Sequence, residues 1–122
     1  KLAHFWDAKV YVALNTLVAD EEMMSAIFYA GELYRAGVDA VIVQDIGLLR
    51  LLRIALPQFA VHASTQMSIH NASGCQLLKT MGVERVILAR ELSLQDMELI
   101  RQATDIGLET FVHGALCVCY SG

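Results

Sequence analysis

Short apolar segments alternate with longer amphipathic segments along the chain. The apolar segments are rich in β-branched and aromatic residues and lack strict alternation with polar ones, which is typical of strands covered on both faces. They comprise residues 10–14, 40–43, 59–63, 86–88 and 109–113. Between them, apolar residues recur at helical spacing, as in Met23, Ile27 and Ala30. The pattern predicts about five parallel strands with intervening helices.

Residues with capping preferences mark the expected starts of helices. Asp20, Asp45 and Ser93 each stand where an N-cap is expected, and Asp96 follows Ser93 at the capping-box position. Asp45 could alternatively be a ligand, but a cap is the ordinary role of such a residue. Pro57 prevents the helix that follows Asp45 from continuing.

Three helix-to-strand junctions share one pattern. Residues 36–43, 81–88 and 106–113 each contain a helix end, a glycine, an aliphatic residue, an acid, one spacer and an apolar strand. We expect Gly37 to end its helix as the C′ residue, and Gly82 and Gly107 to end the later helices. The period of these junctions favours repeated βα units.

Two parallel architectures accommodate such units. An open, flavodoxin-like sheet is one, but no glycine-rich fingerprint follows any strand. A complete (β/α)8 barrel needs about 250 residues. The regular period and abrupt ends favour an α/β fold that is a fragment of a (β/α)8 TIM-type barrel, with residues 1–122 as a single partial barrel domain.

Composition narrows the classes of function and compartment. The chain is 56% hydrophobic and 18% charged, with a net charge of −4, which argues against a self-sufficient nucleic-acid binder. Three cysteines are too few for a disulfide scaffold and favour a reducing compartment. The longest stretch without charged residues, 54–78, contains Pro57, Gln58 and His62 and does not suit a membrane span. We therefore expect a cytoplasmic protein with no membrane partner.

Polar residues gather after the carboxyl ends of the predicted strands, where parallel α/β folds place their catalytic groups. They are Asn15 after the first strand, Gln66 after the third, Arg90 and Glu91 after the fourth, His113 at the end of the fifth, and Cys117 beyond it. Arg90 and Glu91 are adjacent, so on a strand they would point to opposite faces. His62, within the third strand, suits a structural role and a base equally.

Other potentially reactive side chains are expected to have structural roles. Cys75 falls at helical spacing from Leu78 and is expected in the core. Glu109 stands at the start of the predicted fifth strand, where anchoring a neighbouring turn is its expected role. The sequence contains neither a His-Glu-x-x-His zinc motif nor a Gly-x-Ser-x-Gly elbow. The residues alone therefore show no apparatus for peptide hydrolysis.

Residues 109–122 resemble the signature of the peptidase U32 family, also called the collagenase-like protease family. Its pattern is Glu-x-Phe-x-x-Gly-Ser/Ala-aliphatic-Cys-x4-Gly-x-Cys. The matching residues are Glu109, Phe111, Gly114, Ala115, Leu116, Cys117 and Gly122. Residues 10–15, 64–66 and 88–93 also agree, so the resemblance covers nearly the whole chain.

The resemblance implies a TIM-type barrel of which this chain holds about the third to seventh strand units. Some members of the family are linked to protein or collagen degradation. Others support oxygen-independent hydroxylation, either of a tRNA or rRNA base with a prephenate-derived donor or of a quinone ring. These members use four cysteines, linked in the quinone branch to an iron–sulfur cluster. Cys117 would be the first of the four, the second would follow Gly122 by two residues, and Cys119 is not part of the set.

The resemblance and the residues together favour hydroxylation of an RNA base or similar ring over peptide hydrolysis; a non-catalytic assembly role is the third hypothesis. In this interpretation His113 and Glu91 manage protons, while Cys117 is catalytic and the metal and cofactor ligand of an iron–sulfur cluster in the full-length protein. The expected substrate-binding residues are Asn15, Gln66, Arg90 and His62. RNA or protein substrate would also bind through parts outside this chain. We expect the fragment itself to be inactive and to form homo-oligomers through its cut barrel edges.

Overall fold

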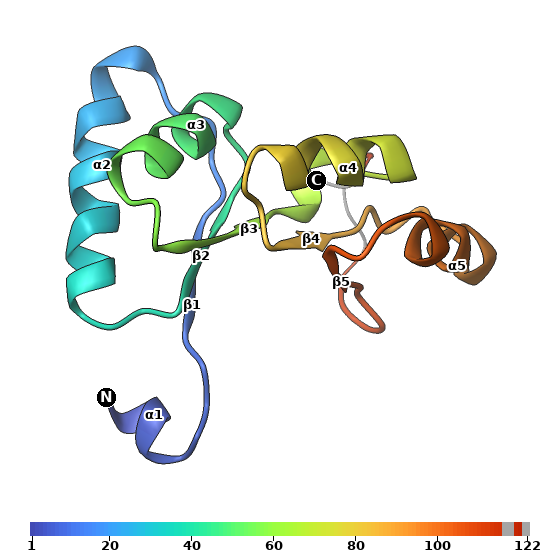
Figure 1. Ribbon diagram of the computed structural model, residues 1–122, viewed down its shortest axis with the longest axis horizontal. Helices are drawn as coiled ribbons and strands as arrows, with labels where there is room; N and C mark the ends of the chain where they lie inside the picture. The colour runs from blue at the N-terminus through green and yellow to red at the C-terminus, as the bar shows by residue number, and fades with distance from the viewer. Residues whose placement is uncertain (116–118, 121–122) are drawn as a thin grey trace. The chain divides into compact units, whose positions relative to one another are not determined.

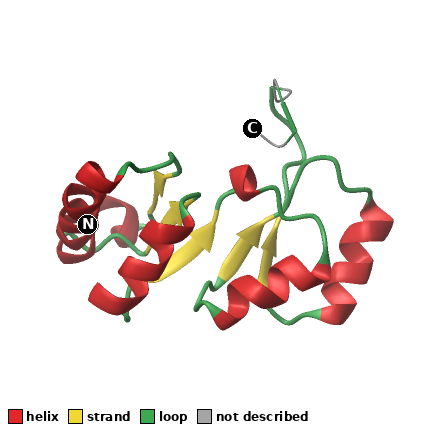
Figure 2. Cartoon of the chain, turned by 90° about the horizontal axis from the view of Figure 1, so that it is seen from above, coloured by secondary structure: helices red, strands yellow, loops and turns green. Residues whose placement is uncertain are grey.

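The computed structural model describes residues 1–115 and 119–120 and contains five short strands that alternate with helices (Figures 1 and 2). The elements are α1 (Leu2–Phe5), β1 (Tyr11–Leu14), α2 (Asp20–Arg35), β2 (Ala40–Val43), α3 (Ile46–Ala55), β3 (Ala60–Ala63), the 3-10 helix η1 (Thr65–Met67), α4 (Ala72–Thr80), β4 (Arg85–Ile87), α5 (Leu94–Ala103) and β5 (Gly107–Glu109). The chain divides into two compact units, Lys1–Val61 and His62–Gly122.

In the first unit, β1 and β2 form a parallel pair and α2 lies against α3 (Figure 1). The register runs from Tyr11 opposite Ala40 to Leu14 opposite Val43. Val41 and Val43 are fully buried, as are three leucines of α3, namely Leu48, Leu49 and Leu52. Burial of these apolar side chains is the main force that holds the unit together.

Asp39, in the turn between α2 and β2, ties three segments of the first unit together. Its carboxylate accepts the Val10 N–H at 2.6 Å and lies 2.8 Å from Nε2 of His4. The hydrogen bond from the Val10 backbone and then that with the His4 side chain hold the pKa of Asp39 below its ordinary value. The acid of the first Gly-aliphatic-acid junction therefore anchors the amino-terminal segment.

In the second unit, the last two residues of β3, His62 and Ala63, lie parallel to β4, and β4 lies parallel to β5. His62 pairs with Arg85 across β3 and β4, and Arg85 pairs with Gly107 across β4 and β5. Helices α4 and α5 contact each other, and Nε2 of Gln76 donates to the Ala103 carbonyl at 2.9 Å. The unit's buried residues include Ala63, Val86, Cys75, Leu78 and Ile100.

Two of the three predicted N-caps are confirmed. The Asp45 carboxylate accepts the Leu48 N–H at 2.8 Å, so Asp45 caps α3. Ser93 Oγ accepts the Asp96 N–H, and the Asp96 carboxylate accepts the Ser93 N–H, which completes a capping box. The prediction for α2 was wrong: Asp20 is its first helical residue and Ala19 is the N-cap, because the Glu22 carboxylate accepts the Ala19 N–H at 3.1 Å.

Gly37 and Gly82 end α2 and α4 as the sequence predicts. Both have positive φ, +86° and +82°. After α4, the Gly82 N–H donates to the Lys79 carbonyl and the Val83 N–H to the Leu78 carbonyl, both at 3.0 Å. This is the Schellman arrangement, in which the aliphatic residue after the glycine packs back on the helix.

The third junction differs from the other two, and the prediction that Gly107 ends a helix was wrong. Helix α5 ends at Ala103, and Gly107 is the first residue of β5. The Gly107 N–H donates to the Glu84 carbonyl at 3.0 Å, and a Cβ at position 107 would lie 2.8 Å from that oxygen. The glycine here permits close approach of two strands.

The fifth strand is therefore Gly107–Glu109 and not residues 109–113 as predicted. Glu109 lies at the strand's carboxyl end instead of its start, and His113 lies beyond the strand in a bend. Among the described residues, no helix has both the length and the apolar character needed to cross a membrane.

Candidate functional site

Hydrogen bonds to main-chain carbonyls join the segments at the carboxyl ends of the second unit's strands. Oγ1 of Thr65, after β3, donates to the Leu88 carbonyl at 3.1 Å, and the Ala89 N–H donates to the Ile69 carbonyl at 3.0 Å. The Leu88 N–H donates to the Glu109 carbonyl at 2.9 Å. We call the segments that follow these strands, residues 64–70, 88–91 and 110–115, the exit cluster. Because the three strands are parallel, these segments share one edge of the sheet.

Gln66 lies in η1, at the first segment of the exit cluster. Ser64 Oγ accepts the Gln66 N–H at 3.2 Å and lies 3.4 Å from the Gln66 Oε1. Ser64 is buried and Gln66 is half-buried. These contacts hold the carboxamide close to the end of β3, where the sequence predicts a substrate-binding residue.

Arg90 and Glu91 lie in a turn after β4, which ends at Ile87. The expectation that they point to opposite faces of a strand therefore does not apply. The guanidinium carbon of Arg90 lies 5.3 Å from the centroid of the Phe111 ring, and its Nη1 donates to the Ala115 carbonyl. Arg90 thus contacts the segment that follows β5, while Glu91 is exposed.

His113 lies in that same segment and is exposed. It stands between Phe111 and Ala115, the two residues that Arg90 contacts. The structure therefore places Gln66, Arg90, Glu91 and His113 on neighbouring segments of the exit cluster, and His113 is not a strand residue.

His62 lies within the sheet and is 5% exposed. It pairs in register with Arg85, whose Nη1 lies 3.2 Å from a carboxylate oxygen of Glu109. Because Ile87 pairs with Glu109, alternation places His62, Arg85 and Glu109 on one face. Glu109 thus joins two strands, and the burial of His62 suits the structural role that its sequence position also allowed.

Two predicted residues are not brought into this set. Asn15 directly follows β1 in the first unit, where it is half-buried. Cys117, the predicted catalytic residue and cluster ligand, lies outside the described residues. Their roles stay predictions.

The described residues do not fit an iron–sulfur cluster. In residues 1–115 and 119–120, no three His, Cys, Asp or Glu side chains are grouped so as to hold a metal ion. Burial raises the pKa of the Cys75 thiol, which opposes the thiolate that a metal requires, and Cys75 belongs to the core as predicted. Cys119 is exposed. Ligands that complete a cluster with Cys117 would have to come from outside this chain.

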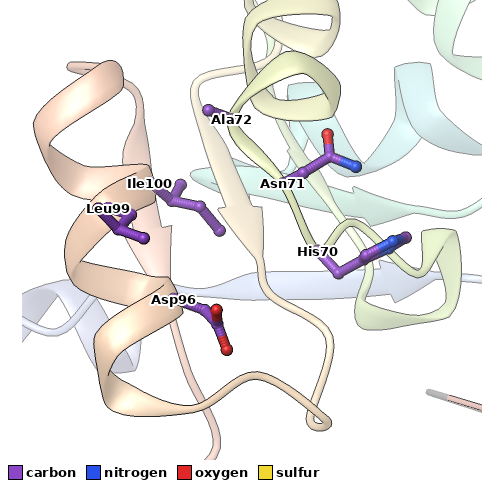
Figure 3. A pocket seen from close by; sticks show the side chains of 6 residues that line it. All are labelled: His70, Asn71, Ala72, Asp96, Leu99 and Ile100. Atoms are coloured by element: carbon purple, nitrogen blue, oxygen red, sulfur yellow. The ribbon is translucent and has the colours of Figure 1, made fainter.

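A hollow of about 190 Å³ lies between α4 and α5 and is lined by His70, Asn71, Ala72, Asp96, Leu99 and Ile100 (Figure 3). Its polar atoms already have structural roles. Asn71 Oδ1 accepts the Gly74 N–H at 2.8 Å, and Asp96 belongs to the capping box. The His70 side chain points away from Asp96 (Figure 3), and its Nδ1 is 2.8 Å from the Ser68 carbonyl. The hollow therefore offers less chemistry than the exit cluster.

Sequence reasoning missed the partners that organise the site. Phe111 was part of the recognised signature, but nothing in its spacing indicates contact with Arg90. Arg85 begins a strand, and only the register reveals that it meets Glu109. Tyr120 packs its ring edge-on against His70, with centroids 6.0 Å apart.

Comparison with known proteins gives consistent sequence matches. The profile of peptidase family U32 matches residues 1–122. A 23S rRNA 5-hydroxycytidine synthase of Escherichia coli is 46% identical over 120 residues, which are 98% of this chain and 18% of that protein. The tRNA hydroxylation protein P of E. coli is 40% identical over 98% of this chain and 27% of its own length. The chain thus spans less than a third of these two relatives.

Two solved structures share the fold. A U32 peptidase superposes with a TM-score of 0.71 at 18% identity, over 89% of this chain and 47% of that one. A KDPG aldolase of Legionella pneumophila superposes with a TM-score of 0.57 at 17% identity, over 80% of this chain and 46% of its own. At such identities the likeness shows the fold alone, and it confirms the predicted α/β architecture of the TIM-barrel type.

Proposed function

Because the chain belongs to peptidase family U32, we propose that it is part of the substrate-binding barrel of an enzyme that hydroxylates a base in RNA. The observation that carries this proposal is the similarity to two RNA-hydroxylation proteins over 98% of this chain. The part of the chain that is similar to these proteins includes the three segments of the exit cluster. The net charge of −4 is compatible with it if RNA backbone contacts lie elsewhere in the full-length protein.

Hydroxylation replaces a ring C–H bond with a C–O bond. The base loses two electrons, the oxygen donor gains two as its bond to oxygen breaks, and the ring proton must be taken up. In our proposal Glu91 and His113, on neighbouring segments, take up and return protons. The Gln66 carboxamide orients the base through its amide donor and acceptor.

Peptide hydrolysis is the second candidate, since the family and one structural neighbour carry the name peptidase. Against it, Ser64 Oγ contacts Gln66, which is not a base, and no three His, Cys, Asp or Glu side chains among the described residues are grouped so as to hold a metal ion. Known hydrolytic sites place such a nucleophile within hydrogen-bond reach of its base. We therefore favour hydroxylation.

Nucleoside mass spectrometry of cellular RNA tests the proposal. Deleting the gene should remove a nucleoside that is heavier than its parent by one oxygen atom, and the full-length wild-type protein should restore it. Glu91→Gln should reduce the restored level by about 100-fold if Glu91 is a general acid–base group. Glu98→Gln, at an exposed glutamate of α5, is the matched control and should restore the nucleoside fully.

The competing hypothesis predicts a different result. If deletion leaves every hydroxylated nucleoside in place and the purified full-length protein cleaves gelatin, the hydroxylation proposal is wrong. If Glu91→Gln restored the nucleoside to the wild-type level, the proposed function would stand, but Glu91 would have no part in the chemistry.

A further inference from the structure

The segment that follows β5 is held at two points by one side chain from the neighbouring β4 exit. The guanidinium carbon of Arg90 lies 5.3 Å from the Phe111 ring centroid, and its Nη1 donates to the Ala115 carbonyl. His113 is midway between these two contacts in the sequence and is itself exposed. A single cation therefore spans the stretch that carries the predicted proton-transfer residue.

The backbone that precedes Arg90 is buried and hydrogen-bonded. The residue before it, Ala89, is 1% exposed and donates its N–H to the Ile69 carbonyl at 3.0 Å. Leu88 is equally buried and donates its N–H to the Glu109 carbonyl, where the β5 exit begins. The backbone from which Arg90 projects is thus fixed to both neighbouring exits.

The two contacts use properties that only arginine combines. Its planar guanidinium can face an aromatic ring while N–H groups in the plane donate to a carbonyl. A lysine ammonium keeps the charge but lacks the rigid fork. The second contact is to a main-chain carbonyl, which fixes the path of the backbone and not merely the position of one side chain.

We infer that Arg90 is a positioning residue, which holds residues 111–115 against the β4 exit and so presents the His113 imidazole at the edge shared with Gln66 and Glu91. This differs from the substrate-binding role that the sequence suggests for Arg90. The inference rests on the proposed function for the proton-transfer role of His113. The contacts themselves do not depend on it.

Steady-state kinetics of the full-length protein separates the two roles. Arg90→Gln should lower kcat by about 10- to 100-fold, because a misplaced catalytic group costs rate, while KM stays within about threefold. Arg90→Lys, which retains the cation, should recover part of the loss. Arg50→Gln, at an exposed arginine of α3, is the matched control and should behave as wild type. A rise in KM with unchanged kcat would show instead that Arg90 binds substrate.

Phe111→Leu provides a second variant of the same contact. It removes the aromatic face but keeps an apolar side chain. If Arg90 and Phe111 act through the same contact, the double variant of Arg90→Gln and Phe111→Leu should lose little more activity than either single variant. Full additivity of the two losses would overturn the inference.

Proteolysis tests the contact without any activity. Chymotrypsin cleaves after aromatic residues, and Phe111 is half exposed but held by Arg90. Cleavage after Phe111, followed by mass spectrometry, should be faster in Arg90→Gln than in wild type or Arg50→Gln. Equal rates would overturn the inference. Should the wild-type protein hydroxylate no RNA, the proposed function fails, and the cleavage rates still decide whether Arg90 holds the segment.

Discussion

Two glycines of this chain, Gly31 and Gly82, differ in backbone conformation and in the effect that a side chain would have. Gly82 adopts a φ of +82° at the end of α4, where a side chain would be strained. Gly31 lies inside α2, and a Cβ added there would meet no atom within 4 Å. The same substitution is therefore expected to have opposite effects at the two sites.

Gly82→Ala should lower the free energy of unfolding by about 1 kcal/mol, the cost of a left-handed alanine. Gly31→Ala should raise it by about 0.5 to 1 kcal/mol, because alanine loses less backbone entropy in a helix. Urea titration followed by circular dichroism measures both. The explanation would fail if both variants shifted the midpoint in the same direction.

At the scale of elements, charged side chains in a turn and in two strands join separate segments of the chain. Asp39 links the α2–β2 turn to Val10 and His4. Arg85 and Glu109 link β4 to β5. Both Asp39 and Glu109 are the acid of a Gly-aliphatic-acid junction, so the sequence pattern and the contact are related.

Acid should weaken the first unit through Asp39. Its pKa is lowered in the folded state, chiefly by the Val10 backbone hydrogen bond and then by His4. A lowered folded-state pKa means that this stabilisation is complete above the unfolded-state pKa of about 4 and is lost as pH falls through the folded-state value. Asp39→Asn should therefore reduce stability clearly at pH 6 and much less at pH 3, as measured by thermal unfolding.

The control for this prediction is Asp7→Asn, at an exposed carboxylate in the same unit. It should change the melting temperature little at either pH. An Asp39→Asn variant whose loss of stability is as large at pH 3 as at pH 6 would show that the effect does not come from the ionised carboxylate.

At the scale of the whole molecule, apolar side chains remain exposed in the polypeptide of residues 1–122. Leu2, Phe5, Trp6, Met24 and Phe28 are all largely exposed. Among the described residues, β1 pairs with β2 on one side only and β5 with β4 on one side only. Open strand edges and apolar patches favour association.

We therefore predict that the isolated polypeptide self-associates at micromolar concentration. Sedimentation velocity over a range of concentrations measures this, and Phe28→Glu should shift the distribution toward the monomer. A monomer at every concentration would contradict the prediction.

The sequence by itself determined the alternation of strands and helices, the caps at Asp45 and Ser93, and the glycine ends at Gly37 and Gly82. These features depend on side-chain period and on interactions within a few residues, which a sequence records directly. It also indicated that Gln66, Arg90, Glu91 and His113 follow strand ends, because parallel strands share one carboxyl edge.

Only the tertiary structure decided where β5 lies and what Arg90 contacts. Gly107 suits a helix end and a close strand approach equally well in sequence, and its pairing with Arg85 and Glu84 selects the second. That shift moves His113 off the strand and into the segment that Arg90 holds. Such contacts join residues more than 20 positions apart, and their geometry follows from strand register, which no local pattern specifies.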